Sequence, residues 1–255
     1  FLAGVVPGIL MCICLAIAAY VIAIKKNYPS EPFPGIRVVL LTAAQALPGF
    51  VTAVIIVGGV LSGVFTVTES GAFGAIYAVL LTAFVYRSLS WEGFKLSVTN
   101  SVRTTSMVMI LIGCAGAFGY LLAFYQVPGL LSTFLLAISD NPIMILLMIN
   151  VMLLLLGMIM DMAALILICT PIFLPIARDI GMDPTQFGIM LLMNLGLGLC
   201  TPPVGSCLFV GCAVGKVPIE QAIRTIWPFY LAILAALLLV TFVPAVSLTL
   251  PALLE

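Results

Sequence analysis

A stretch of twelve residues, Asn194-Leu-Gly-Leu-Gly-Leu-Cys-Thr-Pro-Pro-Val-Gly205, carries the residue types that can bind a small cation. Its two prolines have no backbone N–H, so we expect the carbonyls of Gly198 and Leu199 to lack helical partners. In hydrocarbon, such a break is tolerated only beside a protein-lined or watery cavity, and discontinuous helices form the ion sites of secondary transporters. Thr201 adds a hydroxyl oxygen. The stretch therefore predicts a Na⁺ site, and the open alternative is a proline kink that only shapes packing.

Two carboxylates stand at the start of apolar segments. Asp161 ends Gly157-Met-Ile-Met-Asp161, where its side chain can cap the following helix. A charge within the membrane also indicates a function, so a direct role of Asp161 in ion binding or gating stays open. Glu69 begins another apolar run, where we expect Thr68 to be the cap and Glu69 to complement the helix dipole.

The elements that must position these groups are short. Residues 143–177 form an apolar stretch that Gly157 and Asp161 divide into halves of about 143–156 and about 162–177. A membrane-spanning helix needs about 20 apolar residues, so each half is short for a span. We therefore expect a re-entrant hairpin with its tip near Gly157 to Asp161, and two thin full spans are the alternative.

Composition places the chain in a membrane. Hydrophobic residues make up 64% and charged residues 7% of the 255 residues, and the mean hydropathy is +1.36. A soluble domain carries about a quarter charged residues, whereas this chain has room for about seven to nine membrane segments. The net charge is zero, which argues against nucleic acid as a partner. The seven cysteines form no Cys-x-x-Cys pair and are interpreted as small buried hydrophobic residues.

The same composition argues against catalysis. An intramembrane aspartyl protease needs two carboxylates that share one site, and only Asp161 and Glu69 are candidates. A serine–histidine dyad is excluded because the sequence has no histidine. We therefore expect no enzymatic activity and no catalytic residue.

Apolar runs give the order of the expected helices. They cover about 3–24, 40–64, 70–86, 104–125, 128–139, 143–177, 185–214 and 225–250, with a proline-rich linker from Asn27 to Arg37 and an amphipathic interfacial segment at 88–103. If the loop after the first run is cytoplasmic, only Arg178 among the nine basic residues lies outside, as the positive-inside rule favours. The inside residues are Lys25, Lys26, Arg37, Arg87, Lys95, Arg103, Lys216 and Arg224.

Four ordered motifs resemble a known family. Gly63-Val-Phe-Thr-Val-Thr-Glu-Ser-Gly71, Leu156-Gly-Met-Ile-Met-Asp161, Thr170-Pro-Ile-Phe-Leu-Pro175 and the Pro-Pro stretch are similar to the large membrane (M) subunit of TRAP (tripartite ATP-independent periplasmic) transporters. The family commonly has proline where this chain has Val67. The resemblance implies that the chain is the C-terminal repeat portion of a longer polypeptide. The implied fold is an all-α integral membrane protein, the second half of an inverted-repeat elevator transporter with a re-entrant hairpin and a Pro-Pro-broken helix.

The resemblance also implies a function. It is Na⁺-coupled import of a small organic anion, of the sialic acid or C4-dicarboxylate class, across the bacterial inner membrane. The partners would be a periplasmic binding protein and a small membrane subunit, separate or fused. The Na⁺ site would use Gly157, Gly198 and Thr201, and Leu199 and Asp161 are further candidates. We expect residues 1–142 to link and brace, 143–215 to form the transport-domain hairpin and broken helix, and 216–255 to hold the last transmembrane helix. A passive channel or membrane scaffold is the alternative.

Overall fold

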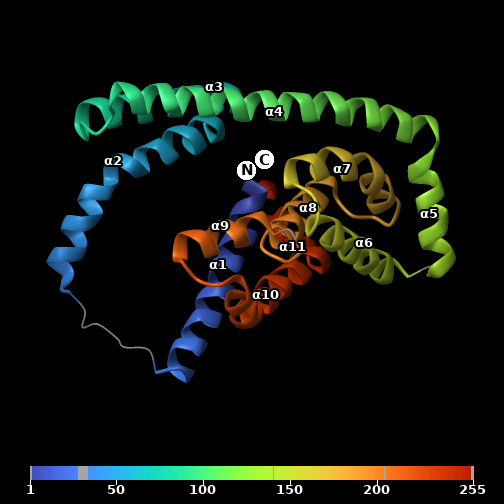
Figure 1. The fold of residues 1–255 in the computed structure, drawn as a ribbon. Coiled ribbons are helices and arrows are strands. Elements are labelled where there is room, and N and C mark those ends of the chain that lie inside the picture. The colour runs from blue at the N-terminus through green and yellow to red at the C-terminus, as the bar shows by residue number, and fades with distance from the viewer. Residues whose placement is uncertain (1, 28–33, 140, 204, 254–255) are drawn as a thin grey trace. The chain divides into compact units, whose positions relative to one another are not determined.

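The computed structural model describes residues 2–27, 34–139, 141–203 and 205–253, and the regular elements within them are helices (Figure 1). Part of the expected linker, residues 28–33, lies outside the described residues. The chain divides into two compact units, Tyr28–Ser106 and Leu2–Asn27 with Met107–Glu255. The elements are α1 (Leu2–Lys25), α2 (Ile36–Leu61), α3 (Val67–Leu80), the π-helical turn η1 (Leu81–Val85), α4 (Trp91–Phe124), α5 (Val127–Ile138), α6 (Pro142–Gly157), α7 (Met162–Asp179), α8 (Pro184–Leu199), α9 (Ser206–Gly215), α10 (Ile219–Phe242) and α11 (Pro244–Ala252).

Helix length and composition support an integral membrane protein. Six segments of the described residues are long and apolar enough to cross a bilayer, and α6 and α8 are shorter apolar helices. The six are Leu2–Lys25, Ile36–Leu61, Val67–Val85, Trp91–Leu122, Met162–Asp179 and Ile219–Phe242. The all-helical membrane class is therefore confirmed, whereas the repeat and the re-entrant path of the α6–α7 pair stay predictions.

In the first unit, α2 packs against α3, and the start of α3 corrects one expectation. Thr66, not Thr68, is the N-cap, and its hydroxyl accepts a hydrogen bond from the Glu69 N–H at 3.3 Å. The Glu69 carboxylate accepts one from the Thr66 N–H at 2.8 Å, which completes a capping box. A box needs its acid three residues after the cap, and only Thr66 has that spacing to Glu69.

Helix α4 corrects a second expectation. The interfacial segment at 88–103 and the apolar run at 104–125 belong to one helix, Trp91–Phe124. No proline interrupts this stretch, so every residue keeps its backbone donor. The glycines at 113, 116 and 119 lower helix propensity by only about 1 kcal/mol each relative to alanine, which does not end the helix.

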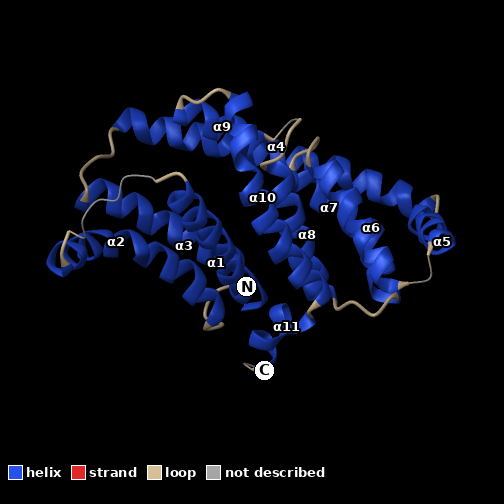
Figure 2. Cartoon of the chain, turned by 90° about the horizontal axis from the view of Figure 1, so that it is seen from below, coloured by secondary structure: helices blue, strands red, loops and turns tan. Residues whose placement is uncertain are grey.

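The core of the second unit lies between α6, α7, α8 and α10, which Figure 2 shows side by side. Helix α6 contributes Ile145, Ile149 and Leu153, whose four-residue spacing places them on one face. Phe173 of α7 and Phe187 of α8 are the largest fully buried side chains. Helix α8 contacts α1, α6, α7, α9, α10 and α11, so it is the central element of this unit.

A buried polar network joins three of these helices. The Asn194 side-chain amide of α8 donates to the backbone carbonyl and to the side-chain carbonyl of Asn150 in α6, both at 2.9 Å. The Gln186 amide of α8 donates to the carbonyls of Val240 and Thr241 in α10 at 2.9 and 3.0 Å. Buried polar groups need partners in a membrane interior, so these bonds fix the register of α8 against α6 and α10.

The last predicted helix, 225–250, is corrected at both ends. The structure has α10 from Ile219 to Phe242 and a separate α11 from Pro244 to Ala252. Pro244 has no N–H to continue α10, and Val243 before it is extended, with φ −117° and ψ 91°. Proline is well tolerated in the first turn of a helix, so the residue that ends α10 also begins α11.

Candidate functional site

Helix α8 ends at the predicted break, but its last hydrogen bonds differ from the expectation. The helix stops at Leu199, and the Gly198 carbonyl accepts a bond from the Thr201 N–H at 2.9 Å. The expectation that this carbonyl is unpartnered is therefore wrong, because Thr201 keeps its N–H and closes a tighter turn. The Leu199 carbonyl is different: residues 202 and 203, which would be its helical donors, are both prolines. A carbonyl has two lone pairs, so the Gly198 oxygen keeps one for a second partner.

Gly157 and Gly198 bring the C-terminal ends of α6 and α8 into backbone contact. A Cβ on Gly198 would lie 2.6 Å from the Gly157 carbonyl carbon and 2.9 Å from its carbonyl oxygen. A Cβ on Gly157 would lie 3.4 Å from the Gly198 Cα. Both glycines are buried. The two predicted residues thus lie together, and only glycine at position 198 permits this approach.

Thr201 lies next to this contact in the chain and is partly buried. Its hydroxyl donates to the Leu197 carbonyl at 2.7 Å. Because the hydroxyl proton is used in that bond, the lone pairs of the oxygen remain available to a cation.

Asp161 is exposed and is the N-cap of α7. Its carboxylate accepts a hydrogen bond from the Ala163 N–H at 2.9 Å, so the predicted cap is confirmed. Asn141 and Asp183 cap α6 and α8 in the same way, each followed by a proline at the first helical position. A direct role of Asp161 in ion binding stays a prediction.

The electrostatics of the Gly157–Gly198 contact suit a cation. Each helix C-terminus carries the equivalent of about −0.5 elementary charge on its unpaired carbonyls, and here two such ends meet. Hard cations prefer oxygen ligands, and the carbonyls with the Thr201 hydroxyl supply them. Among the described residues, no group of three or more His, Cys, Asp or Glu side chains is placed to hold a metal ion. A cation here would therefore depend on backbone and hydroxyl oxygens.

Sequence reasoning gave no role to two residues at the break. Gly205 has φ +33°, and a Cβ there would lie 2.9 Å from the Thr201 carbonyl oxygen. Its signal in the sequence is a glycine directly after Pro-Pro-Val, where α9 must begin from an unusual backbone angle. Tyr230 of α10 donates its hydroxyl to the Cys200 carbonyl. Its place 30 residues further along the chain gives no sequence signal for that contact.

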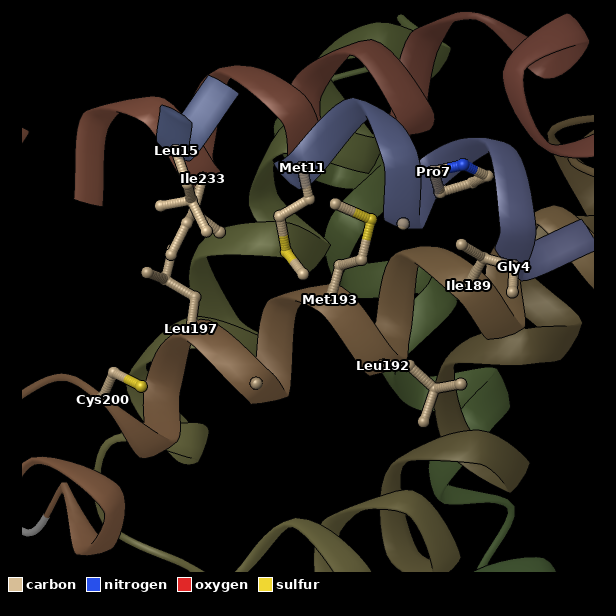
Figure 3. A pocket seen from close by; sticks show the side chains of 12 residues that line it. Gly4, Pro7, Met11, Leu15, Ile189, Leu192, Met193, Leu197, Cys200 and Ile233 are labelled. Atoms are coloured by element: carbon tan, nitrogen blue, oxygen red, sulfur yellow. The ribbon is translucent and has the colours of Figure 1, made fainter. Parts of the chain in front are cut away.

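A separate cavity lies on the other face of α8. It has a volume of about 410 Å³ between α1 and α8, with Ile233 of α10 at its wall (Figure 3). In Figure 3, Met11 of α1 and Met193 of α8 point toward one another across it. Its lining residues carry no charged side chain. The Gly198 face of α8 packs on α6, so this apolar cavity is distinct from the candidate cation site.

Comparisons with known proteins agree on one family. A family model described as "Tripartite ATP-independent periplasmic transporter, DctM component" matches residues 1–246. The C4-dicarboxylate TRAP transporter large permease protein DctM of Pseudomonas aeruginosa is 40% identical over 251 residues, which are 98% of this chain and 59% of that protein. The sialic acid TRAP transporter large permease protein SiaM of Vibrio cholerae is 38% identical over 251 residues, again 98% and 59%.

The 2,3-diketo-L-gulonate TRAP transporter large permease protein YiaN of Escherichia coli is 32% identical over 244 residues, which are 96% of this chain and 57% of that protein. The chain thus spans less than three fifths of the length of these relatives.

Proposed function

We propose that this chain forms part of a Na⁺-coupled importer of a small organic anion. The proposal starts from its family, because the chain belongs to the DctM component family of tripartite ATP-independent periplasmic transporters. The family is one of transporter permeases and not of enzymes. With six candidate membrane spans among its described residues, the chain is a multi-pass protein of the bacterial inner membrane. The coupling ion, the substrate and the mechanism are the proposed part.

The proposed substrate is a small carboxylic acid. The names of three relatives refer to C4-dicarboxylate, sialic acid and 2,3-diketo-L-gulonate, all of which are organic acids. We propose the same class for the complete transporter that contains this chain. A periplasmic binding protein would deliver the anion, and a small membrane subunit, separate or fused, would complete the membrane part.

The observation that carries the proposal is the meeting of two helix C-termini at Gly157 and Gly198. The negative ends of two helix dipoles lie in contact there, and Thr201 adds an oxygen three residues after Gly198. A Na⁺ ion bound there would be stabilised by both helices at once. It would hold the α6–α7 pair against the broken helix, so ion binding and the geometry of the break would depend on each other.

An elevator movement is the mechanism that fits this arrangement. Helices α6, α7 and α8 share one core of closely packed apolar side chains, so they are expected to move as one body. Helix α6 has 16 residues, or roughly 24 Å at 1.5 Å per residue, which is shorter than the hydrocarbon core of about 30 Å. Helix α7 has 18 residues and meets the length of a span. Helix length therefore supports the proposed hairpin for α6 but not for α7.

The test uses Thr201→Ala in the complete transporter, reconstituted with its binding protein. The substitution removes one oxygen and leaves the prolines in place, so we expect a higher Na⁺ concentration for half-maximal uptake with little change in expression. Thr249→Ala is the matched control, because its hydroxyl also donates to the carbonyl four residues back at 2.7 Å. Uptake that does not depend on Na⁺ in the parent would instead favour a passive channel or scaffold.

A further inference from the structure

Tyr230 makes a contact that connects α10 to the break in α8. Its hydroxyl donates a hydrogen bond to the carbonyl of Cys200, the first residue after α8. The residue three positions after Cys200 is Pro203, which has no N–H, so a tight turn gives this carbonyl no donor there. The tyrosine hydroxyl therefore supplies a partner that the proline has removed.

The side chain of Tyr230 is well placed to hold a fixed position. It is only 8% exposed, and its ring packs edge-on against Trp227 with the ring centroids 5.8 Å apart. Helix α10 contacts both α8 and α9, the two helices on either side of the break. A tyrosine has few rotatable bonds, so burial of its ring fixes where its hydroxyl lies.

The Cys200 carbonyl and the Thr201 N–H belong to the same peptide unit. A peptide unit is planar and rigid, so its oxygen and its N–H cannot be oriented independently. Tyr230 binds the oxygen of this unit, and the N–H of the same unit donates to the Gly198 carbonyl at 2.9 Å. The orientation that Tyr230 imposes is therefore passed directly to Gly198 and to Thr201.

We infer that Tyr230 is a positioning residue for the candidate cation site. It holds the Cys200–Thr201 peptide plane so that the Gly198 carbonyl and the Thr201 hydroxyl keep the geometry that a cation requires. It does not touch the ion itself. This inference rests on the proposed function, because it needs a Na⁺ site at the break.

The test is Tyr230→Phe in the complete transporter. Phenylalanine keeps the ring and its packing, so the fold is retained, and only the hydroxyl is lost. Tyr77→Phe is a matched control, because the Tyr77 hydroxyl donates to the Pro48 carbonyl at 3.1 Å in the other unit, between α3 and α2. Both variants lose one hydrogen bond from a tyrosine to a backbone carbonyl, but only one of the two carbonyls lies at the break.

For Tyr230→Phe we expect a rise of about fivefold in the Na⁺ concentration for half-maximal uptake, the effect of losing one hydrogen bond of ordinary net strength. The KM for the substrate at saturating Na⁺ should stay unchanged. The stabilisation of the purified protein by Na⁺ in thermal unfolding should also decrease. Tyr77→Phe should leave all three quantities at the parent's values.

The possible outcomes distinguish a failure of the positioning role from a failure of the proposed function. Na⁺ dependence in Tyr230→Phe equal to that of the parent would overturn the positioning role and leave the proposed function standing. A parent transporter that neither requires Na⁺ nor is stabilised by it would overturn the proposed function, and the positioning role with it. An equal rise in the Na⁺ concentration for half-maximal uptake in both tyrosine variants would overturn the positioning role, because it would show a general loss of stability.

Discussion

Gly157 and Gly198 lie in direct backbone contact, with the position of a Gly198 Cβ only 2.6 Å from the Gly157 carbonyl carbon. Real Cβ atoms do not approach backbone this closely, so the contact exists only because residue 198 has no side chain. It joins the C-terminal ends of α6 and α8. The close approach of these two helix ends therefore depends on the absence of a methyl group at position 198.

Gly198→Ala should weaken the fold and the cation site together. The new methyl group would collide with backbone atoms, which cannot rotate away as a flexible side chain can. We expect a loss of about 1–3 kcal/mol in the free energy of unfolding, measured by SDS titration in mixed micelles, and weaker stabilisation by Na⁺.

Gly188→Ala in the same helix is the control, because no heavy atom lies within 4 Å of its Cβ position. It should be neutral or stabilise by up to about 1 kcal/mol. Equal effects of the two substitutions would contradict the importance of the contact.

Asp161 can be tested for its two roles with two substitutions. Asp161→Asn keeps a side-chain oxygen that can accept from the Ala163 N–H, whereas Asp161→Ala removes it. If the residue is only a cap, the alanine variant loses about 1 kcal/mol of unfolding free energy, and the asparagine variant resembles the parent in stability and in Na⁺ dependence. A raised Na⁺ requirement in the asparagine variant, with stability intact, would instead show that the charge itself acts on the ion. We expect the first result, since Asp161 is exposed.

The sequence was a good guide where one residue decides the local structure. Proline and the capping residue Asp161 act through their own backbone or side chain within a few positions, so the ends of α6, α7 and α8 were predictable to within a few residues. The meeting of Gly157 with Gly198 came from a family resemblance, because no local property of either glycine indicates the other.

What the sequence did not provide depends on tertiary packing or on exact spacing. The bond from Tyr230 to Cys200 and the Asn150–Asn194 pair join residues far apart in the chain, and no periodicity connects them. The cap of α3 was misplaced because two threonines stand close together, and only the spacing from Thr66 to Glu69 fits a capping box. The partner of the Gly198 carbonyl was missed because a helix end can close with a tighter turn.

The side of the membrane to which the α6–α7 pair returns can be tested by labelling single cysteines from outside, in a background without the native cysteines. The predicted topology makes Asp183→Cys accessible from the periplasm and Lys216→Cys inaccessible. Labelling of both from the same side would contradict it. Asp140, at the other end of the pair, lies outside the described residues.

A further position separates the hairpin from two thin spans. Ile159→Cys lies between α6 and α7, and its parent side chain is 60% exposed. Two full spans would place it in the cytoplasm, open to a membrane-impermeant reagent in inverted vesicles. A re-entrant hairpin would keep it within the membrane, where that reagent reacts slowly.

The break in α8 should be essential for ion coupling rather than for stability. Replacing Pro202 and Pro203 with alanine restores N–H donors for the carbonyls of Gly198 and Leu199, and helix propensity favours the change by about 3 kcal/mol per proline in a helix interior. A continuous helix would use those carbonyls in its own hydrogen bonds. We therefore expect Na⁺-driven uptake to fail, while the thermal stability of the purified double variant is kept or raised.

The packing-kink interpretation predicts the opposite order of effects. If the prolines only shape the contacts of α8, the double variant loses stability or assembly, and whatever protein folds keeps its Na⁺ coupling. Thermal unfolding with and without Na⁺, with K⁺ at equal ionic strength as the control, measures both the stability of the double variant and its stabilisation by Na⁺. Stabilisation by Na⁺ that equals the parent's would show that the carbonyls at the break do not bind the ion. Loss of that stabilisation, in a protein as stable as the parent without Na⁺, is the result expected from a cation site built on the Leu199 carbonyl and its neighbours.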